Sequence, residues 1–243
     1  MNLSALLASL RISKNQVIIS QPNLRELQMK YSAVWKDKEI PSRQLRVTAK
    51  QLSSIDKVPA IADLITLIRQ TNLSHPHILE VGCSTGYHLA AFKKAKVPVV
   101  YEGCDYSSTF IDKARELYPK VPFKVSDATK LDYGSNRFDI VISGGCILHI
   151  IDYQRAIKEA VRVAKKYVIF HRTPIIHMRE TTYTKKIGYG LEMVEILFNE
   201  GELTNLFYKN KLVIVALNSH GQFDVPGLRE TVFMKSYLCR KST

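Results

Sequence analysis

The chain has 243 residues, of which 46% are hydrophobic and 23% charged, a balance that excludes a disordered or low-complexity protein. No apolar run approaches the roughly 20 residues that span a bilayer, so no transmembrane segment is predicted. Lysine and arginine outnumber aspartate and glutamate by 35 to 22, and the net charge of +13 favours anionic partners such as nucleotides, phosphorylated sugars, nucleic acid or an acidic membrane surface.

The N-terminal part of the chain, residues 1–72, has the apolar spacing of helices. Met1–Leu10 is short and lacks the basic opening of a signal peptide, so we expect a helix that packs on the body. Asn23 is a candidate N-cap for the next helix, and a further helix is expected to begin near Pro59. The sequence therefore predicts a helical cap or lid over residues 1–72 and a second domain over residues 73–243.

From His77 onward, short apolar strands alternate with helices, which is typical of a parallel sheet covered on both faces. The expected strands are His77–Val81, Val97–Gly103, Pro122–Val125, Phe138–Ser143 and Tyr167–Phe170. The expected helices are Leu89–Lys96, Thr109–Tyr118 and Tyr153–Lys165. After Gly190 we expect a long helix over Leu191–Tyr208, followed by an antiparallel, hairpin-like pair of strands at the sheet edge, Leu212–Leu217 and Thr231–Cys239.

The most informative stretch is the first strand of this series and the turn that follows it, Ile78 to Tyr87. Small residues in such a turn let a ligand approach the backbone, and the next helix offers unpaired N–H groups. Dinucleotide-binding proteins use this geometry with the pattern GxGxxG. Ser84 and Tyr87 stand at the second and third glycine positions, so the nicotinamide-dinucleotide interpretation fails at two of three glycines.

The same stretch resembles the first motif of class I methyltransferases, E/D-x-G-x-G-x-G. Glu80, Gly82 and Gly86 match the motif, and Ser84 replaces its middle glycine with another small residue. The resemblance implies S-adenosylmethionine as cofactor, with S-adenosylhomocysteine as product. It places cofactor contacts on Glu80, Gly82, Cys83, Ser84 and Gly86.

Three later features fall in the order that this resemblance requires. Asp105-Tyr106 ends the second strand, where the family places an acidic residue on the ribose hydroxyls, although an aspartate there could also cap the next helix. Asp127-Ala128 follows the third strand, where the family binds adenine; a simple turn aspartate is the alternative. The run from Phe138 into Ser143-Gly144 resembles the fourth-strand motif, which adds those two residues to the cofactor site.

The resemblance covers residues 76–172 well and the remainder in outline. It implies an α/β, Rossmann-like fold: a mostly parallel seven-stranded sheet with an antiparallel C-terminal strand, helices on both faces, and the N-terminal helical segment in addition. Within the family it points to the small-molecule branch of types 11 and 25.

Two histidines are candidates for a general base, which oxygen acceptors often need. His149 lies just past the fourth strand and His171 at the end of the fifth, where the reaction centre of a parallel sheet is expected. Each could instead have a structural role. The stretch 172–189, with Arg172, Lys185 and Lys186, is either a substrate lid that recognises phosphate or carboxylate, or a solvated loop.

The sequence constrains the methyl acceptor mainly through the motifs that it lacks. Ser143-Gly144-Gly145-Cys146 lacks the prolines of adenine or glutamine N-methyltransferases, and Cys146 lacks the Pro-Cys context of cytosine methylation. We therefore expect an S-adenosylmethionine-dependent methyltransferase acting on a small molecule, at an oxygen of a sugar or of another anionic or glycosylated metabolite. A nucleic-acid methyltransferase and a non-catalytic S-adenosylmethionine-binding protein remain alternatives. The four scattered cysteines form no CxxC pair, so no metal site is predicted and the expected compartment is the cytoplasm.

Overall fold

The structure of the chain is a computed structural model, and it describes residues 11–12 and 16–242. The helix expected at Met1–Leu10 lies outside the described residues. In the part of the chain that is described, no helix is both long and apolar enough to cross a membrane.

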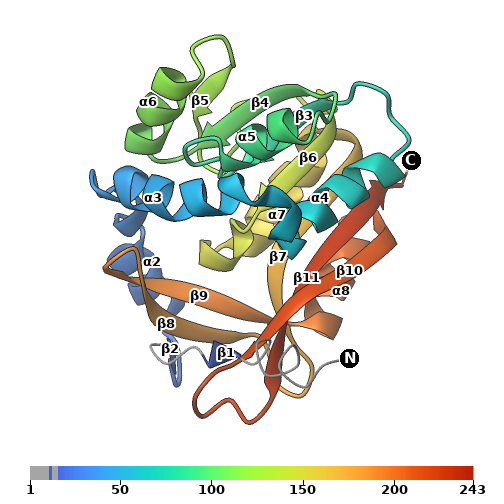
Figure 1. Cartoon of the computed structure of the whole chain (residues 1–243). Helices are drawn as coiled ribbons and strands as arrows, with labels where there is room; N and C mark the ends of the chain where they lie inside the picture. Colours follow the sequence, from blue (N-terminus) through green and yellow to red (C-terminus); the bar gives the residue numbers. More distant parts are fainter. Residues whose placement is uncertain (1–10, 13–15, 243) are drawn as a thin grey trace.

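A twisted sheet forms the centre of the molecule (Figure 1). Seven of its strands lie in the order β10-β11-β7-β6-β3-β4-β5, and all of them run in the same direction except β11. Their bounds are β3 His77–Val81, β4 Val100–Asp105, β5 Phe123–Val125, β6 Phe138–Gly144, β7 Ala164–Ile176, β10 Leu212–Asp224 and β11 Thr231–Lys241. This arrangement confirms the predicted Rossmann-like sheet with its antiparallel C-terminal strand.

Helices bury the apolar side chains on both faces of this sheet. One hydrophobic cluster includes residues of α4 (Pro59–Gln70), α5 (Tyr87–Lys94) and α6 (Ser108–Leu117). A second cluster includes residues of α7 (Tyr153–Val163) and α8 (Glu200–Lys209) on the other face. The helices that follow β3, β4 and β6 thus begin at the carboxyl ends of their strands, which is where ligands bind in such sheets.

A three-stranded side sheet branches from the end of β7 and corrects one prediction. It contains β2 (Gln16–Ile18), β8 (Thr182–Gly188) and β9 (Leu191–Asn199), with β8 antiparallel to both of the others. The helix predicted over Leu191–Tyr208 is wrong in its first half, because consecutive side chains from Met193 to Phe198 are all buried and a strand can bury both of its faces at once. Only Glu200–Lys209 is helical there.

The same sheet changes the interpretation of two other segments. Residues 172–189 are not a solvated loop, since β7 continues to Ile176 and β8 occupies Thr182–Gly188. The prediction that the whole N-terminal part is helical is wrong at β1 (Arg11–Ile12) and β2, which pair with β10 and β8. The strands that they pair with lie about 170 to 210 residues later in the sequence, so the local sequence does not identify β1 and β2 as strands.

Between β2 and α4 the N-terminal segment is helical, as expected. It forms α2 (Leu24–Tyr31), the 3-10 turn η1 (Val34–Lys36), α3 (Ile40–Ser53) and the 3-10 turn η2 (Ile55–Lys57). The Asn23 side chain accepts the Glu26 N–H at 3.2 Å, which confirms it as the N-cap of α2. Figure 1 shows α3 between α5 and β9, and residues of α3 face the loops that follow the central strands.

Candidate active site

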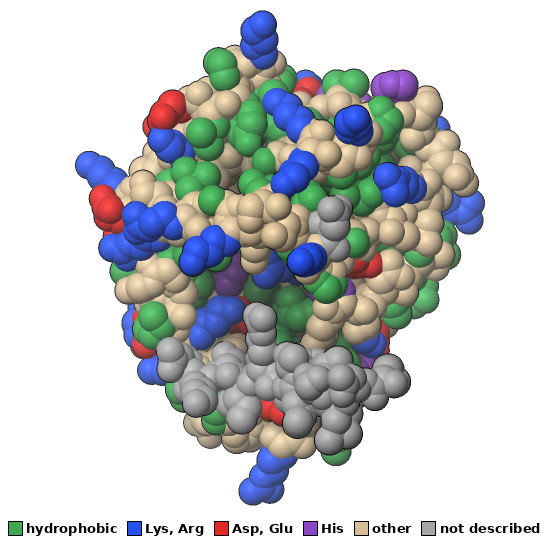
Figure 2. Space-filling view, in the orientation of Figure 1, with side chains coloured by type: hydrophobic (Ala, Val, Ile, Leu, Met, Phe, Trp, Pro, Cys, Tyr) green, Lys and Arg blue, Asp and Glu red, His purple; other side chains and the backbone are tan. Residues whose placement is uncertain are grey.

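A cavity of about 1990 Å³ lies at the carboxyl ends of β3, β4 and β6. Its walls come from the loops after these strands, from α2, η1 and α3, from the β8–β9 hairpin, and from the end of β10. Figure 2 shows the hollow on this face, with Lys, Arg and His side chains inside it. The volume exceeds the roughly 300–1,000 Å³ of a site for a single small ligand, so the cavity has room for two.

The turn after β3 has the geometry that its glycines allow. Gly82 has φ +73°, and a Cβ there would lie 2.5 Å from Cys146 Sγ. Gly86 has φ +83° at the start of α5. Ser84 stands where the family motif has glycine, and it adopts a left-handed φ of +48°. The serine therefore keeps the backbone shape of the motif, at the cost of a conformation that non-glycine residues rarely adopt.

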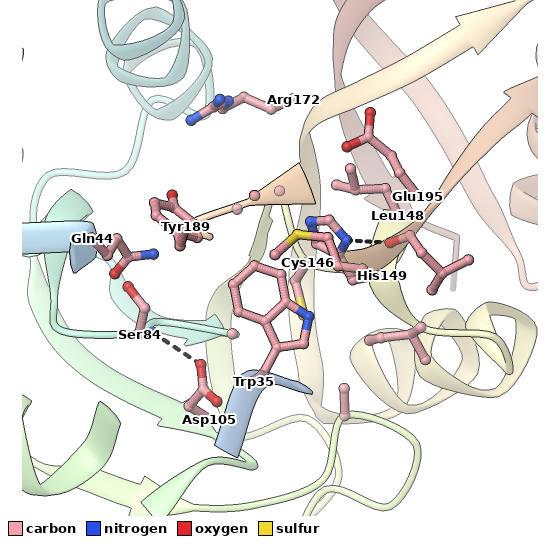
Figure 3. A pocket seen from close by; sticks show the side chains of 18 of the residues that line it. Trp35, Gln44, Ser84, Asp105, Cys146, Leu148, His149, Arg172, Tyr189 and Glu195 are labelled. Carbon is pink, nitrogen blue, oxygen red and sulfur yellow. Dashed lines mark hydrogen bonds between the residues drawn. The ribbon is translucent and has the colours of Figure 1, made fainter. Parts of the chain in front are cut away.

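Asp105, at the tip of β4, is bonded to this turn. Its Oδ2 accepts the Ser84 N–H at 3.1 Å and its Oδ1 accepts the Ser107 N–H at 3.0 Å (Figure 3). Burial raises the pKa of Asp105 to about 6, against the lowering effect of the Ser107 and Ser84 amides. The carboxylate lines the cavity with lone pairs to spare, so it can accept further hydrogen bonds from a ligand.

Asp127 and Ala128 line the same cavity as Asp105. Asp127 Oδ1 accepts both the N–H and the hydroxyl of Thr129, at 2.7 and 2.8 Å, which leaves its second oxygen for a ligand. Tyr106 also lines the cavity, and its hydroxyl donates to the Ser32 carbonyl at 2.8 Å. Tyr106 therefore connects the second strand to the N-terminal segment.

Glu80 lies at the buried floor of the cavity and is 2% exposed. It accepts a hydrogen bond from the Tyr101 hydroxyl, and its Oε1 lies 2.6 Å from His88 Nδ1. A Cβ at Gly144 would lie 2.5 Å from the His88 ring and 2.9 Å from Glu80 Oε1, so only glycine fits there. The acidic residue of the motif is thus fixed in place by an aromatic hydroxyl and an imidazole.

The structure brings most of the predicted cofactor residues to one cavity. Those that line it are Glu80, Gly82, Cys83, Ser84, Asp105, Tyr106, Asp127, Ala128 and Gly144. Gly86 and Ser143 lie beside it without lining it: Gly86 is the N-cap of α5, and Ser143 is 3% exposed within β6.

The two candidate bases differ in position. His149 lines the cavity, and its Nδ1 donates to the Val194 carbonyl at 2.8 Å (Figure 3). Burial, with Lys186 and Arg172 nearby, lowers the pKa of His149 to about 3. His171 is 1% exposed and lies behind the cavity wall, with Nδ1 2.8 Å from Ser236 Oγ. Burial holds its pKa well below the usual value. A catalytic role for either one stays a prediction.

Some residues of the cavity were not singled out from the sequence. Glu195 lies within the segment that was expected to be helical, and it forms an ion pair with Lys186 inside the cavity wall. His220, on β10, lines the cavity close to Asp63 of α4. In the sequence, one local feature indicates this pair: Asp63 is an acidic residue on the apolar face of the helix that was predicted to begin near Pro59.

Comparisons with known proteins agree with this geometry. Residues 79–170 match the model of a family described as a methyltransferase domain. Norajmaline N-methyltransferase of Rauvolfia serpentina is 44% identical over 54 residues, which are 22% of this chain and 18% of that protein. Ubiquinone biosynthesis O-methyltransferase of Coxiella burnetii is 30% identical over 101 residues, 40% and 42% of the two chains. The chain matches less than half the length of these curated relatives.

Solved structures extend the likeness of fold over almost the whole chain. The 1,6-didemethyltoxoflavin-N1-methyltransferase of Burkholderia thailandensis, solved with 1,6-didemethyltoxoflavin and S-adenosylhomocysteine, is 14% identical with a TM-score of 0.61, and 94% of this chain and 95% of that chain are covered. Magnesium protoporphyrin IX methyltransferase of Synechocystis PCC 6803, solved with S-adenosylmethionine, is 13% identical with a TM-score of 0.56, covering 93% and 100%. With its sheet order and the matched residues 79–170, the chain carries a methyltransferase domain with the class I, Rossmann-like fold of S-adenosylmethionine-dependent methyltransferases.

Proposed function

We propose that the chain transfers the methyl group of S-adenosylmethionine to an oxygen of a small acceptor that carries a carboxylate, a phosphate or a sugar. The observation that carries this proposal is that one continuous cavity joins the Ser84–Asp105 end to a second end, which bears Arg172 and Lys186. Relatives with O-methyltransferase and N-methyltransferase names support the small-molecule class.

At the first end, the residues fit an adenosyl group. Asp105 offers a buried carboxylate to the two ribose hydroxyls, and Asp127 offers its free oxygen to the adenine amino group. Gly82 and Ser84 let the backbone approach the ligand closely. The bound cofactor supplies an already activated methyl electrophile, so the protein has chiefly to align the acceptor and exclude water.

At the second end, the charges suit an anionic acceptor. Arg172 has a left-handed φ of +56° within β7, beside an irregularity in the pairing of β7 with β11 at Lys235 and Tyr237. Backbone strain of this kind clusters at active sites and ligand clamps. Figure 3 shows the Arg172 side chain on the opposite side of the cavity from Ser84 and Asp105. Lys186, whose pKa burial lowers to about 8, adds a second cation that is shared with Glu195.

We also propose that the N-terminal helices cover the cavity during the reaction. Trp35 packs against His149 and Tyr189, with ring centroids 4.8 and 6.1 Å apart, and Arg43 donates to the Tyr189 carbonyl at 2.8 Å. These contacts close the space between α3 and the β8–β9 hairpin. The four free thiols suit a reducing compartment such as the cytoplasm, which we propose as the site of action.

Calorimetry with S-adenosylmethionine and S-adenosylhomocysteine tests the cofactor half of the proposal, and absence of binding to both would overturn it.

A transfer assay with a radiolabelled methyl group tests the acceptor half. Its acceptor panel pairs hydroxyl compounds with and without a carboxylate or phosphate, and adds short RNA. We expect transfer to anionic members, weakened at least tenfold in Arg172→Gln. Transfer only to neutral compounds or to RNA would contradict the proposed acceptor.

A further inference from the structure

An aspartate–histidine pair lies buried at the wall of the cavity, away from the cofactor motifs. Asp63 Oδ2 of α4 and His220 Nδ1 of β10 are 3.3 Å apart, and both side chains are 7% exposed. Asp63 lies on a helix face whose other buried residues are all apolar: Ile61, Leu64, Ile65, Leu67 and Ile68. Burying such a pair stabilises a fold less than apolar side chains of the same volume would. The pair therefore calls for an explanation other than stability.

The surroundings of His220 determine which edge of its ring is available. Nδ1 faces Asp63 and also lies 3.4 Å from Ser236 Oγ. Nε2, on the opposite edge, is buried and has no hydrogen-bond partner among the described residues. His220 lines the cavity, together with its neighbours Gly221 and Gln222, whereas Asp63 lies behind it. The imidazole thus stands between a carboxylate and the space where a ligand would bind.

The protonation states suit a proton acceptor. Although burial by itself raises the pKa of Asp63, the nearby polar groups of His220, Ser236 and Asn218 lower it on balance, so the carboxylate is ionised. An ionised Asp63 favours the tautomer with hydrogen on Nδ1, which leaves a lone pair on Nε2. His149 also borders the cavity, but its pKa of about 3 makes it a poor proton acceptor. His171, on β7, lies behind the cavity wall, with its ring centroid 5.4 Å from that of His220.

We propose that His220, oriented by Asp63, is the general base that takes the proton of the acceptor hydroxyl. This inference rests on the proposed function. The acceptor oxygen forms a bond to the methyl carbon while the carbon–sulfur bond breaks. The electron pair of the broken bond stays on sulfur. The hydroxyl proton passes to Nε2, the imidazolium is stabilised by Asp63, and the proton then leaves to solvent. No further reactant is needed.

Three cofactor-shaped ligands test this assignment without the natural acceptor. S-adenosylhomocysteine is uncharged at sulfur, S-adenosylmethionine carries a positive charge on sulfur but no N–H or O–H at its methyl group, and sinefungin places an ammonium donor at the methyl position. We expect His220→Phe to weaken sinefungin binding about tenfold while the affinities for the other two stay within about twofold. Asp63→Asn should give the same pattern, because an amide facing Nδ1 turns Nε2 from an acceptor into a donor.

His177→Ala is the matched control, because His177 is a more exposed histidine paired with Glu200 outside the cavity. It should leave all three affinities unchanged. Unchanged sinefungin affinity in His220→Phe, or an equal loss for S-adenosylmethionine and sinefungin, would overturn the base assignment. Failure of the wild-type chain to bind any of the three would instead overturn the proposed function. Thermal unfolding identifies a misfolded variant, and His220→Gln then replaces His220→Phe in the same comparison.

Discussion

The two ends of the cavity are built from the chain in different ways. At the cofactor end, each contact joins neighbouring strand–loop units: Ser84 and Asp105 are 21 residues apart, and Glu80 and His88 are 8 apart. At the other end, the contacts join distant segments. Tyr31 and Glu192 are 161 residues apart, and Gln16 and Glu195 are 179 apart. The first end is therefore complete once the parallel strands have paired, whereas the second also needs the N-terminal segment to dock.

This difference predicts distinct responses to substitution. Contacts within the parallel sheet belong to the most stable part of such folds, and docked peripheral helices can open locally. Substitutions at the cofactor end should thus act directly on ligand geometry. Substitutions at the second end should act on how long the cavity stays covered.

The largest effect is expected for Gly82→Ala. The new Cβ would lie 2.5 Å from Cys146 Sγ, at a φ of +73° that alanine rarely adopts. Strain of this kind costs roughly 1–3 kcal/mol, and the turn must shift in addition. We expect S-adenosylhomocysteine affinity to fall at least a hundredfold by calorimetry. Gly134→Ala is the control, since a Cβ there meets nothing within 4 Å. Equal affinities for the two variants would show that the turn does not contact the ligand.

Asp105→Asn should weaken S-adenosylhomocysteine binding roughly tenfold to a hundredfold, because a charge-assisted hydrogen bond is worth about 1.5–3 kcal/mol. The wild-type affinity should also fall as the pH drops below about 6, where Asp105 takes up a proton in the free protein. Because its pKa is raised, the stability that this group contributes to the free protein is present at low pH and lost as the pH rises through about 6. A pH-independent affinity between pH 7.5 and 5, indistinguishable from that of Asp105→Asn, would remove this carboxylate from the site.

A smaller effect is expected for Trp35→Ala. The indole packs against Phe110 and His149, with ring centroids 6.4 and 4.8 Å apart, and so joins the N-terminal segment to both ends of the cavity. Losing this cover should weaken S-adenosylhomocysteine binding about tenfold, mainly through faster dissociation, which stopped-flow fluorescence or surface plasmon resonance can measure. Met29→Ala, at a residue 67% exposed on α2, is the control. An unchanged dissociation rate would mean that the segment does not retain the ligand.

The same contrast explains how far sequence reasoning could reach. The alternating strands and helices, the turn at Gly82–Ser84 and the positions of Asp105 and Asp127 could be predicted from local sequence patterns and from the family resemblance that these patterns carry. The strand Leu191–Asn199 could not be recognised locally, because its acidic residues have helix-like spacing while its buried run depends on β7 and β8. His220 likewise could not be recognised as a candidate base from its own segment, because Asp63, the residue it contacts, lies 157 positions earlier in the sequence and on a different element.

The smallest effect should come from Tyr31→Phe, and it decides whether the two ends open independently. The Tyr31 hydroxyl donates to Glu192 Oε1 at 2.6 Å, and Lys30 Nζ lies 3.2 Å from the same oxygen, so these contacts hold α2 on β9. A hydrogen bond of this kind contributes about 1 kcal/mol, which corresponds to roughly fivefold faster amide exchange for a locally opening helix. Hydrogen exchange followed by mass spectrometry should therefore show less protection in Leu24–Tyr31 and no change in His77–Val81. Equal losses of protection in both segments would mean that the N-terminal helices and the sheet open as one unit. In that case local opening of α2 would not be the route by which ligands enter the cavity.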